Sequence, residues 1–209
     1  SARFIRILWL RGLPCAFHAG YPAHFGQSRV HDSCGPAGLH WLNCDDVGQK
    51  TALRSLVDYD IELDLLVNAE ELPAVADAAA AYPSLRIVVN HVAHVSITGR
   101  DPDPAWIKAL RGLASYENVF MKISGFIECA ETQPAPDDPA YYEPTFDALW
   151  NILGEDRLVY GSNWPVCERA GPYETVFKIA DAYFTSKGET AREKYFAGNS
   201  RKAYQLAGR

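Results

Sequence analysis

From residue 60 onward, short runs of apolar, often β-branched residues alternate with longer segments whose apolar positions recur at helical spacing. The strand-like runs cover residues 61–67, 85–90, 119–123 and 158–161. A loop and a helical segment follow each run. The pattern is that of repeated β-α units, and it predicts an α/β protein with mainly parallel strands.

Prolines and capping residues mark the predicted helices. Asp103 and Pro104 have the residue types of an N-cap and a first helical position, a third helix begins at Pro144 and stops at Gly154, and a fourth follows Pro172. Asn199 is expected to cap the last helix. The predicted inward faces are Leu72, Val75, Ala76, Ala79; Trp106, Ile107, Leu110, Leu113, Ala114; Phe146, Leu149, Trp150, Leu153; Tyr173, Val176, Phe177, Ala180, Phe184; and Ala203, Tyr204, Leu206.

Two segments lack either period. Residues 11–50 are rich in Gly, His, Cys and Pro and are expected to form a long irregular loop or insertion. Residues 131–141 contain three prolines and are expected to form an ordered loop over one end of the sheet.

Composition narrows the class of protein. The chain has 209 residues, is 48% hydrophobic and carries a net charge of −6, which is typical of a globular domain. The absence of a Lys/Arg run argues against nucleic acid, and no apolar stretch approaches the roughly 18 residues of a membrane span. Five cysteines without a C-x-x-C pair indicate reduced thiols, so we expect a cytoplasmic protein.

Repeated β-α units form either a doubly wound sheet or a (β/α)8 barrel, and both folds place chemistry at the carboxyl ends of the strands. His91 ends the second run and His94 follows it; a histidine there can bind a metal, donate to a substrate oxygen or act as a base, or simply bond to the backbone. Lys122 shares a strand face with Phe120 and needs an anion, either a substrate or a neighbouring carboxylate such as Asp64.

The last run ends in Gly161-Ser162-Asn163-Trp164-Pro165. The two small residues allow close approach of a ligand, Asn163 presents an amide, and Trp164-Pro165 forms an apolar wall. The same letters are also compatible with an ordinary strand exit.

Four segments together resemble the amidohydrolase-related family, in its branch of sugar lactonases and 2-pyrone-4,6-dicarboxylate lactonase. They are Arg-Ile-Val-Val-Asn-His (86–91), Asn-Val-Phe-Met-Lys-Ile-Ser-Gly (118–125), Asp-Arg-Leu-Val-Tyr-Gly-Ser-Asn-Trp-Pro-Val (156–166) and Gly-Asn-Ser-Arg-Lys-Ala-Tyr (198–204). Their order and spacing agree over residues 53–206. The resemblance implies a TIM-type (β/α)8 barrel that hydrolyses lactones, in some members with a divalent metal such as zinc.

The resemblance also implies roles for individual residues. His91 matches a histidine of strand six, Lys122 the lysine of a K-x-S-G motif, and Asn163 the aspartate of G-S-D-W-P. Asp64 is similar to an acidic position of strand five, and Arg6 is matched to an arginine of strand four. The expected roles are catalytic for His91, Lys122 and Asn163, and substrate-binding for Asp64, Trp164, Ser162 and Arg6; His91 and Asn163 are also the candidate metal ligands.

The chain departs from the family pattern in its first part. The family opens with an H-x-H pair on strand one, and the sequence contains no His-x-His. We therefore interpret residues 1–209 as a single, incomplete barrel that begins at strand four and lacks strands one to three. Its open edges would then need cover from another chain, for which a homo-oligomer is one candidate.

Asn163 is the second departure. In the family mechanism the carboxylate at this position deprotonates the attacking water, and an amide cannot take that proton. Either another base is needed, with His94 or Glu168 as candidates, or the usual hydrolysis has been lost.

The leading hypothesis is a hydrolase of a small lactone or carboxylic ester, with or without a divalent metal. His91 would bind the carbonyl oxygen or a metal, Lys122 substrate carboxylate or hydroxyl groups, and Asn163 would position water. The alternatives are a metal-dependent decarboxylase of the wider family and a catalytically inactive barrel fragment that serves in binding or as a scaffold. A separate zinc site built from Cys15, His18, His31, Cys34, His40 and Cys44 is a weaker hypothesis, because the spacing fits no common zinc motif.

Overall fold

The computed structural model describes residues 47–206. The helices in this range are α1 (Val47–Asp58), α2 (Leu72–Ala81), α3 (Pro104–Gly112), α4 (Glu143–Leu153), α5 (Tyr173–Ser186), α6 (Glu189–Glu193) and α7 (Asn199–Tyr204), with a π-helical turn at Lys194–Gly198 between the last two. The strands are β1 (Leu63–Leu65), β2 (Ile87–Val89), β3 (Val119–Ile123) and β4 (Leu158–Tyr160).

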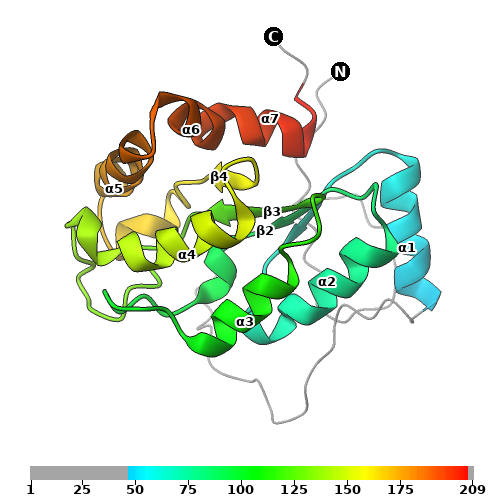
Figure 1. The fold of residues 1–209 in the computed structure, drawn as a ribbon, viewed down its shortest axis with the longest axis horizontal. Coiled ribbons are helices and arrows are strands. Elements are labelled where there is room, and N and C mark those ends of the chain that lie inside the picture. Colours follow the sequence, from blue (N-terminus) through cyan, green and yellow to red (C-terminus); the bar gives the residue numbers. More distant parts are fainter. Residues whose placement is uncertain (1–46, 207–209) are drawn as a thin grey trace, which may run out of the picture.

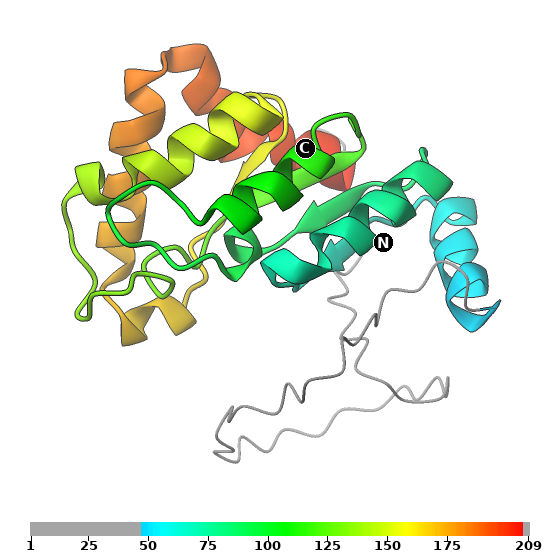
Figure 2. The same ribbon diagram turned by 60° about the horizontal axis from the view of Figure 1, so that its bottom comes forward.

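The described strands form one parallel sheet in the order β1-β2-β3-β4. Helices α2, α3 and α4 lie in a row over the same face of this sheet (Figures 1 and 2). A sheet whose strands follow chain order, with its crossover helices on one side, is wound as the wall of a β/α barrel, whereas a doubly wound sheet reverses its order and carries helices on both faces. The described part of the chain is therefore an open segment of barrel wall.

Each strand separates its side chains between two environments. Val119, Met121 and Ile123 of β3 belong to the large core under the helices, whereas Phe120 packs with Val88, Val159 and Ala203 on the opposite face. Figure 1 shows α7 lying on this opposite side of the sheet. The predicted division of Phe120 and Lys122 from Val119, Met121 and Ile123 is thus confirmed.

Most predicted elements are present, with shifted ends. Strand β3 has the predicted bounds, whereas β1, β2 and β4 are shorter than the predicted runs. The Asp103 side chain accepts hydrogen bonds from the backbone N–H groups of Ala105 and Trp106, as expected of an N-cap, and Gly154 ends α4 with φ of 77°.

Some predictions were wrong. Residues 47–50 belong to α1 and not to an irregular loop, Ala114 is exposed, and Tyr173, Phe177 and Leu206 are 41%, 37% and 53% exposed instead of buried. Asn199 does not cap a helix, because the chain is already helical in the π-helical turn Lys194–Gly198 before it. Its buried amide instead donates to the carbonyl oxygens of Glu155 and Leu158. None of the helices within residues 47–206 is long and apolar enough to cross a membrane.

Candidate active site

Polar side chains gather at the carboxyl ends of β2, β3 and β4. His91 follows β2, Ser124 and Gly125 follow β3, and Asn163 follows β4. In barrel and open α/β folds this edge of the sheet carries the chemistry. It is also where the backbone leaves ordinary geometry, because His91, Gly125 and Asn163 all have positive φ.

The turn from His91 to His94 is left-handed at every residue, with φ between 49° and 53°. Such a run is strained for residues with a Cβ, above all for the β-branched Val92. Tertiary contacts hold it: Val92 and Ala93 are buried, the Trp106 indole donates to the Val92 carbonyl at 3.1 Å, and His94 Nδ1 lies 3.1 Å from the Val67 carbonyl.

The imidazole of His91 is fixed on two sides. Its Nδ1 lies 2.8 Å from the Ser124 hydroxyl oxygen, and a Cβ added at Gly125 would lie 3.0 Å from the ring. Burial, assisted by the charges of His94 and Lys122, lowers the pKa of His91 to about 4. The ring is therefore neutral at pH 7.

Lys122 belongs to a network of polar side chains on the face of the sheet that lies opposite helices α2, α3 and α4. Its ammonium donates to Asp64 Oδ1 at 3.0 Å and to Asn90 Oδ1 at 2.7 Å, and the Tyr204 hydroxyl donates to the same Asp64 oxygen at 2.9 Å. The carboxylate partner considered from the sequence is thus present. It compensates the charge of Lys122 in the sheet, and Tyr204 brings α7 into the network.

Asn163 contacts a residue that the sequence did not single out. Its amide nitrogen donates to Glu128 Oε1 at 2.6 Å. Burial raises the pKa of Glu128 above its ordinary value in spite of this hydrogen bond. The other carboxylate oxygen, Oε2, is buried and accepts no hydrogen bond from the described residues.

Glu128 was missed because it lies 35 residues from Asn163 in the chain, in a loop that also contains Glu131. Nothing in its local sequence distinguishes it. The two candidate bases named from the sequence have other contacts: Glu168 accepts from the Trp164 indole at 2.9 Å, and His94 faces the Val67 carbonyl.

Trp164 and Ser162 border an open surface pocket beyond β4. Trp164 is 62% exposed, and the Ser162 hydroxyl accepts from its backbone N–H. The pocket is lined by Ser162, Trp164, Glu168, Arg169, Ala170, Gly171, Pro172, Tyr173 and Glu174. An exposed indole beside carboxylates and a hydroxyl is a surface on which a polyhydroxylated ligand can stack and hydrogen-bond.

A comparison with known protein families identifies the family from nearly the whole chain. The family model described as Amidohydrolase matches residues 3–206, a range that contains all of these site residues. The chain belongs to the amidohydrolase family. The resemblance seen in the four sequence segments is confirmed.

Two curated relatives of this amidohydrolase are sugar lactonases. An L-fucono-1,5-lactonase of Burkholderia ambifaria is 34% identical over 174 residues, covering 79% of this chain and 57% of the relative. An L-rhamnono-gamma-lactonase of Scheffersomyces stipitis is 29% identical over 143 residues, covering 59% of this chain and 42% of the relative. The chain thus spans little more than half the length of the first relative and less than half of the second.

A crystal structure of an amidohydrolase from Burkholderia multivorans with bound zinc matches with a TM-score of 0.71 and 27% identity, covering 78% of this chain and 59% of that one. In residues 47–206 of the present chain, no three His, Cys, Asp or Glu side chains come together as metal ligands. The described residues alone therefore do not make up a metal site, and the ligand roles expected of His91 and Asn163 stay predictions. Arg6 and the Cys15–Cys44 set, named from the sequence, lie outside the described residues.

Proposed function

We propose that this amidohydrolase cleaves a small sugar-derived lactone by the attack of an activated water on the ring carbonyl. The observation that carries the proposal is that a neutral, fixed imidazole after β2 and a hydrogen-bonded carboxylate-amide pair, which links the loop after β3 to the end of β4, belong to the same edge of one parallel sheet. The lactonase relatives support the substrate class.

His91 binds the carbonyl oxygen in this proposal. We assign the tautomer in which the Ser124 hydroxyl, 2.8 Å from Nδ1, donates to it and the proton of the neutral ring lies on Nε2. This N–H then donates to the carbonyl oxygen as negative charge develops. A neutral imidazole can fill this role because its one N–H polarises the carbonyl by hydrogen bonding and keeps its proton throughout the step.

Lys122 and Asp64 hold the polar groups of the substrate, and Trp164 and Ser162 form the wall on which its ring lies. The ammonium of Lys122 has three N–H groups and two acceptors among residues 47–206, Asp64 and Asn90, so we propose that its third N–H donates to the substrate. Asn163 positions the attacking water through its amide.

The proposal extends to the setting of the enzyme. We propose that residues 1–209 belong to one barrel-type domain that works in the cytoplasm, in keeping with the free thiols of Cys129 and Cys167. A homo-oligomer remains our expectation, and sedimentation of the purified protein measures it directly.

The deciding experiment is hydrolysis of a panel of aldono-1,4- and 1,5-lactones by the full-length protein, followed by pH-stat titration of the acid released. We expect turnover of at least one member, and a loss in kcat of roughly 10²-fold in H91Q, because an oxyanion donor is removed. H94Q should lose less, since its ring does not contact Ser124.

Folded wild-type protein that cleaves no lactone would contradict the proposal. Release of CO2 from an aromatic acid would instead favour a decarboxylase, and ligand binding without turnover would favour an inactive barrel.

A further inference from the structure

Hydrolysis by water needs a proton acceptor near the attacking oxygen. Asn163 has no basic atom, because the lone pair of an amide nitrogen is delocalised and its oxygen is a very weak base. If Asn163 positions the water, the acceptor has to lie within reach of the same amide.

Glu128 is the carboxylate in that place. The hydrogen bond from Asn163 engages only Oε1 and leaves Oε2 buried without a partner among the described residues. Buried polar atoms are nearly always paired, so an unpaired carboxylate oxygen beside a candidate water site needs an explanation. One explanation is that this oxygen accepts a proton from the attacking water.

The turn that carries Glu128 is rigid. Gly125 begins it with φ of 60°, the buried rings of Phe126 and Phe146 pack edge to face, and the Gln133 amide donates to the carbonyls of Ile127 and Ala130. A carboxylate on such a turn has a fixed direction, as general-base catalysis requires.

Charge also favours a single carboxylate here. Two carboxylates at 2.6 Å would repel, and one of them would have to hold a proton at neutral pH. The amide at 163 avoids this conflict and donates to Glu128 instead. The two positions therefore form a complementary pair.

We propose that Glu128 is the general base of the lactone hydrolysis, and that Asn163 orients both its carboxylate and the attacking water. This inference rests on the proposed function.

The step is balanced as follows. A water proton moves to Glu128 Oε2 while the water oxygen forms a bond to the lactone carbonyl carbon, and the π electron pair of the carbonyl moves onto its oxygen beside His91. When this intermediate collapses, the bond between the carbonyl carbon and the ring oxygen breaks. The leaving alkoxide takes the proton from Glu128, giving the hydroxy acid and restoring the carboxylate.

The test removes the carboxylate from position 128 and then places one at position 163, the other member of the hydrogen-bonded pair. E128Q keeps an acceptor for the Asn163 amide and removes the base, and the double variant E128Q/N163D places a carboxylate on the other side of the pair. E131Q is the matched control, because Glu131 is an exposed residue of the same loop. The readouts are kcat and KM on the best lactone substrate, with thermal unfolding as the check of folding.

We expect kcat to fall about 10²- to 10⁴-fold in E128Q, as for loss of a general base, with KM changed less than about threefold. E128Q/N163D should recover at least roughly tenfold over E128Q, which a purely structural role of Glu128 does not predict. E131Q should stay within about twofold of wild type.

A kcat of folded E128Q within about threefold of wild type would overturn the inference, as would a greater loss in H94Q or E168Q than in E128Q. E128D decides the matter even if E128Q does not fold, because it keeps the charge and withdraws it by one methylene; unchanged kcat in E128D also contradicts the inference. If the wild-type protein has no lactonase activity, both the proposed function and this inference are wrong. If the wild type is active and substitution of Glu128 leaves kcat unchanged, only this inference is wrong.

Discussion

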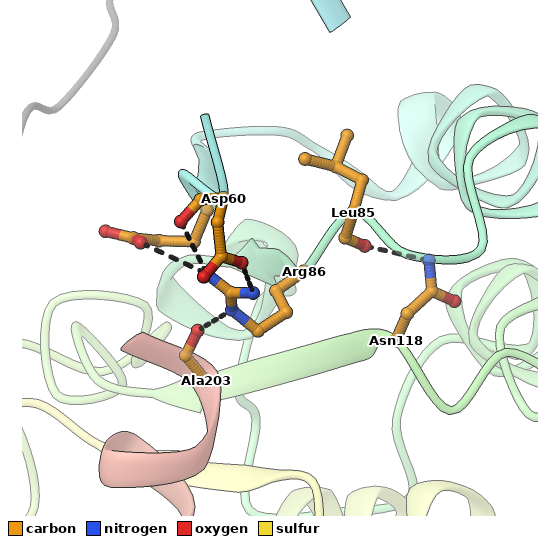
Figure 3. A network of polar contacts seen from close by, with 6 residues as sticks. Asp60, Leu85, Arg86, Asn118 and Ala203 are labelled. Atoms are coloured by element: carbon orange, nitrogen blue, oxygen red, sulfur yellow. Dashed lines mark hydrogen bonds and ion pairs between the residues drawn. The ribbon is translucent and has the colours of Figure 1, made fainter. Parts of the chain in front are cut away.

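The two ends of the sheet differ in how their polar groups are paired: those at the amino end are hydrogen-bonded to backbone carbonyls, and some of those at the carboxyl end have no partner among the described residues. At the amino end, the residue immediately before each of β2, β3 and β4 donates hydrogen bonds to backbone carbonyls. Arg86 bonds to Asp60 and to the Ala203 carbonyl, and Asn118 to the Leu85 carbonyl (Figure 3). Arg157 donates to four carbonyls, those of Leu113, Ala114, Tyr116 and Leu153.

At the carboxyl end, the residues that follow the same three strands have strained backbones and incomplete pairing. His91, Gly125 and Asn163 have positive φ, His91 is a half-buried imidazole with a pKa of about 4, and one oxygen of Glu128 accepts no hydrogen bond from residues 47–206. Strain and unsatisfied groups of this kind persist only where the rest of the fold compensates for them. The contacts at the amino end stabilise the sheet, whereas the carboxyl end holds the groups that we propose to be catalytic in less favourable conformations and surroundings.

The largest expected effect tests the amino end. R157A should lower the free energy of unfolding by about 3 kcal/mol, because several part-buried carbonyls lose a charged donor at once. R111A, an exposed arginine of α3, should change it by less than about 0.5 kcal/mol. Urea unfolding measures both. A loss of kcat in folded R157A would contradict the division between the ends.

The pH dependence of stability tests the carboxyl end. The pKa of His91 is about 4 in the folded protein and 6.5 in its unperturbed form, so between these values the unfolded chain binds the proton and the folded chain does not. The contribution of His91 to stability is therefore complete above pH 6.5 and is lost as pH falls toward 4, by up to about 3 kcal/mol. The difference in unfolding free energy between wild type and H91Q across this range measures it; a flat difference would show that His91 titrates normally.

Two glycine-to-alanine substitutions are expected to change stability by smaller amounts and in opposite directions. G125A should lower stability by about 2 kcal/mol and also reduce kcat, because the new methyl group is forced onto the His91 ring at a left-handed position. Gly112, at the end of α3, has open space around it, and G112A should be neutral or should stabilise by up to about 1 kcal/mol. Equal effects at the two positions would contradict the assignment of strain to the carboxyl end.

The smallest expected effect is at the surface of the amino end. D60N removes the charge that faces Arg86 at 2.6 Å but keeps a side chain that tolerates the φ of 54°. Because Asp60 is exposed, the loss should be about 0.5 kcal/mol and should shrink in high salt. A salt-independent loss of several kcal/mol would mean that this ion pair behaves as a buried one.

Local signals explain how much of the fold was predictable. Alternation within β3 correctly assigned Phe120 and Lys122 to one face, and Asp103-Pro104 and Gly154 marked helix ends, because these features depend on neighbours in the chain. Helix α1 was not predicted at all. Tyr173 and Phe177 were wrongly placed inside, since helical spacing shows which residues share a face but not whether another element covers it.

The candidate site was predicted only in part, for a related reason. Strand ends identify residues that project from the sheet, so His91, Lys122 and Asn163 could be named from the sequence. Of their partners, Asp64 was named as a candidate for Lys122, but Tyr204 and Glu128 were not. Tyr204 reaches Asp64 across 140 residues, and Glu128 reaches Asn163 from a loop with no distinguishing motif.

By itself, the amino-acid sequence of this amidohydrolase determined the order of the strands and of the helices that follow them, the two faces of β3 and the family to which the chain belongs. All of these follow from periodicity, capping and short motifs, which act between residues close together in the chain. The left-handed turn at His91, the neutral state of its ring and the pairing of Glu128 with Asn163 were decided only by tertiary structure. They depend on burial and on the meeting of distant segments, which no local pattern specifies.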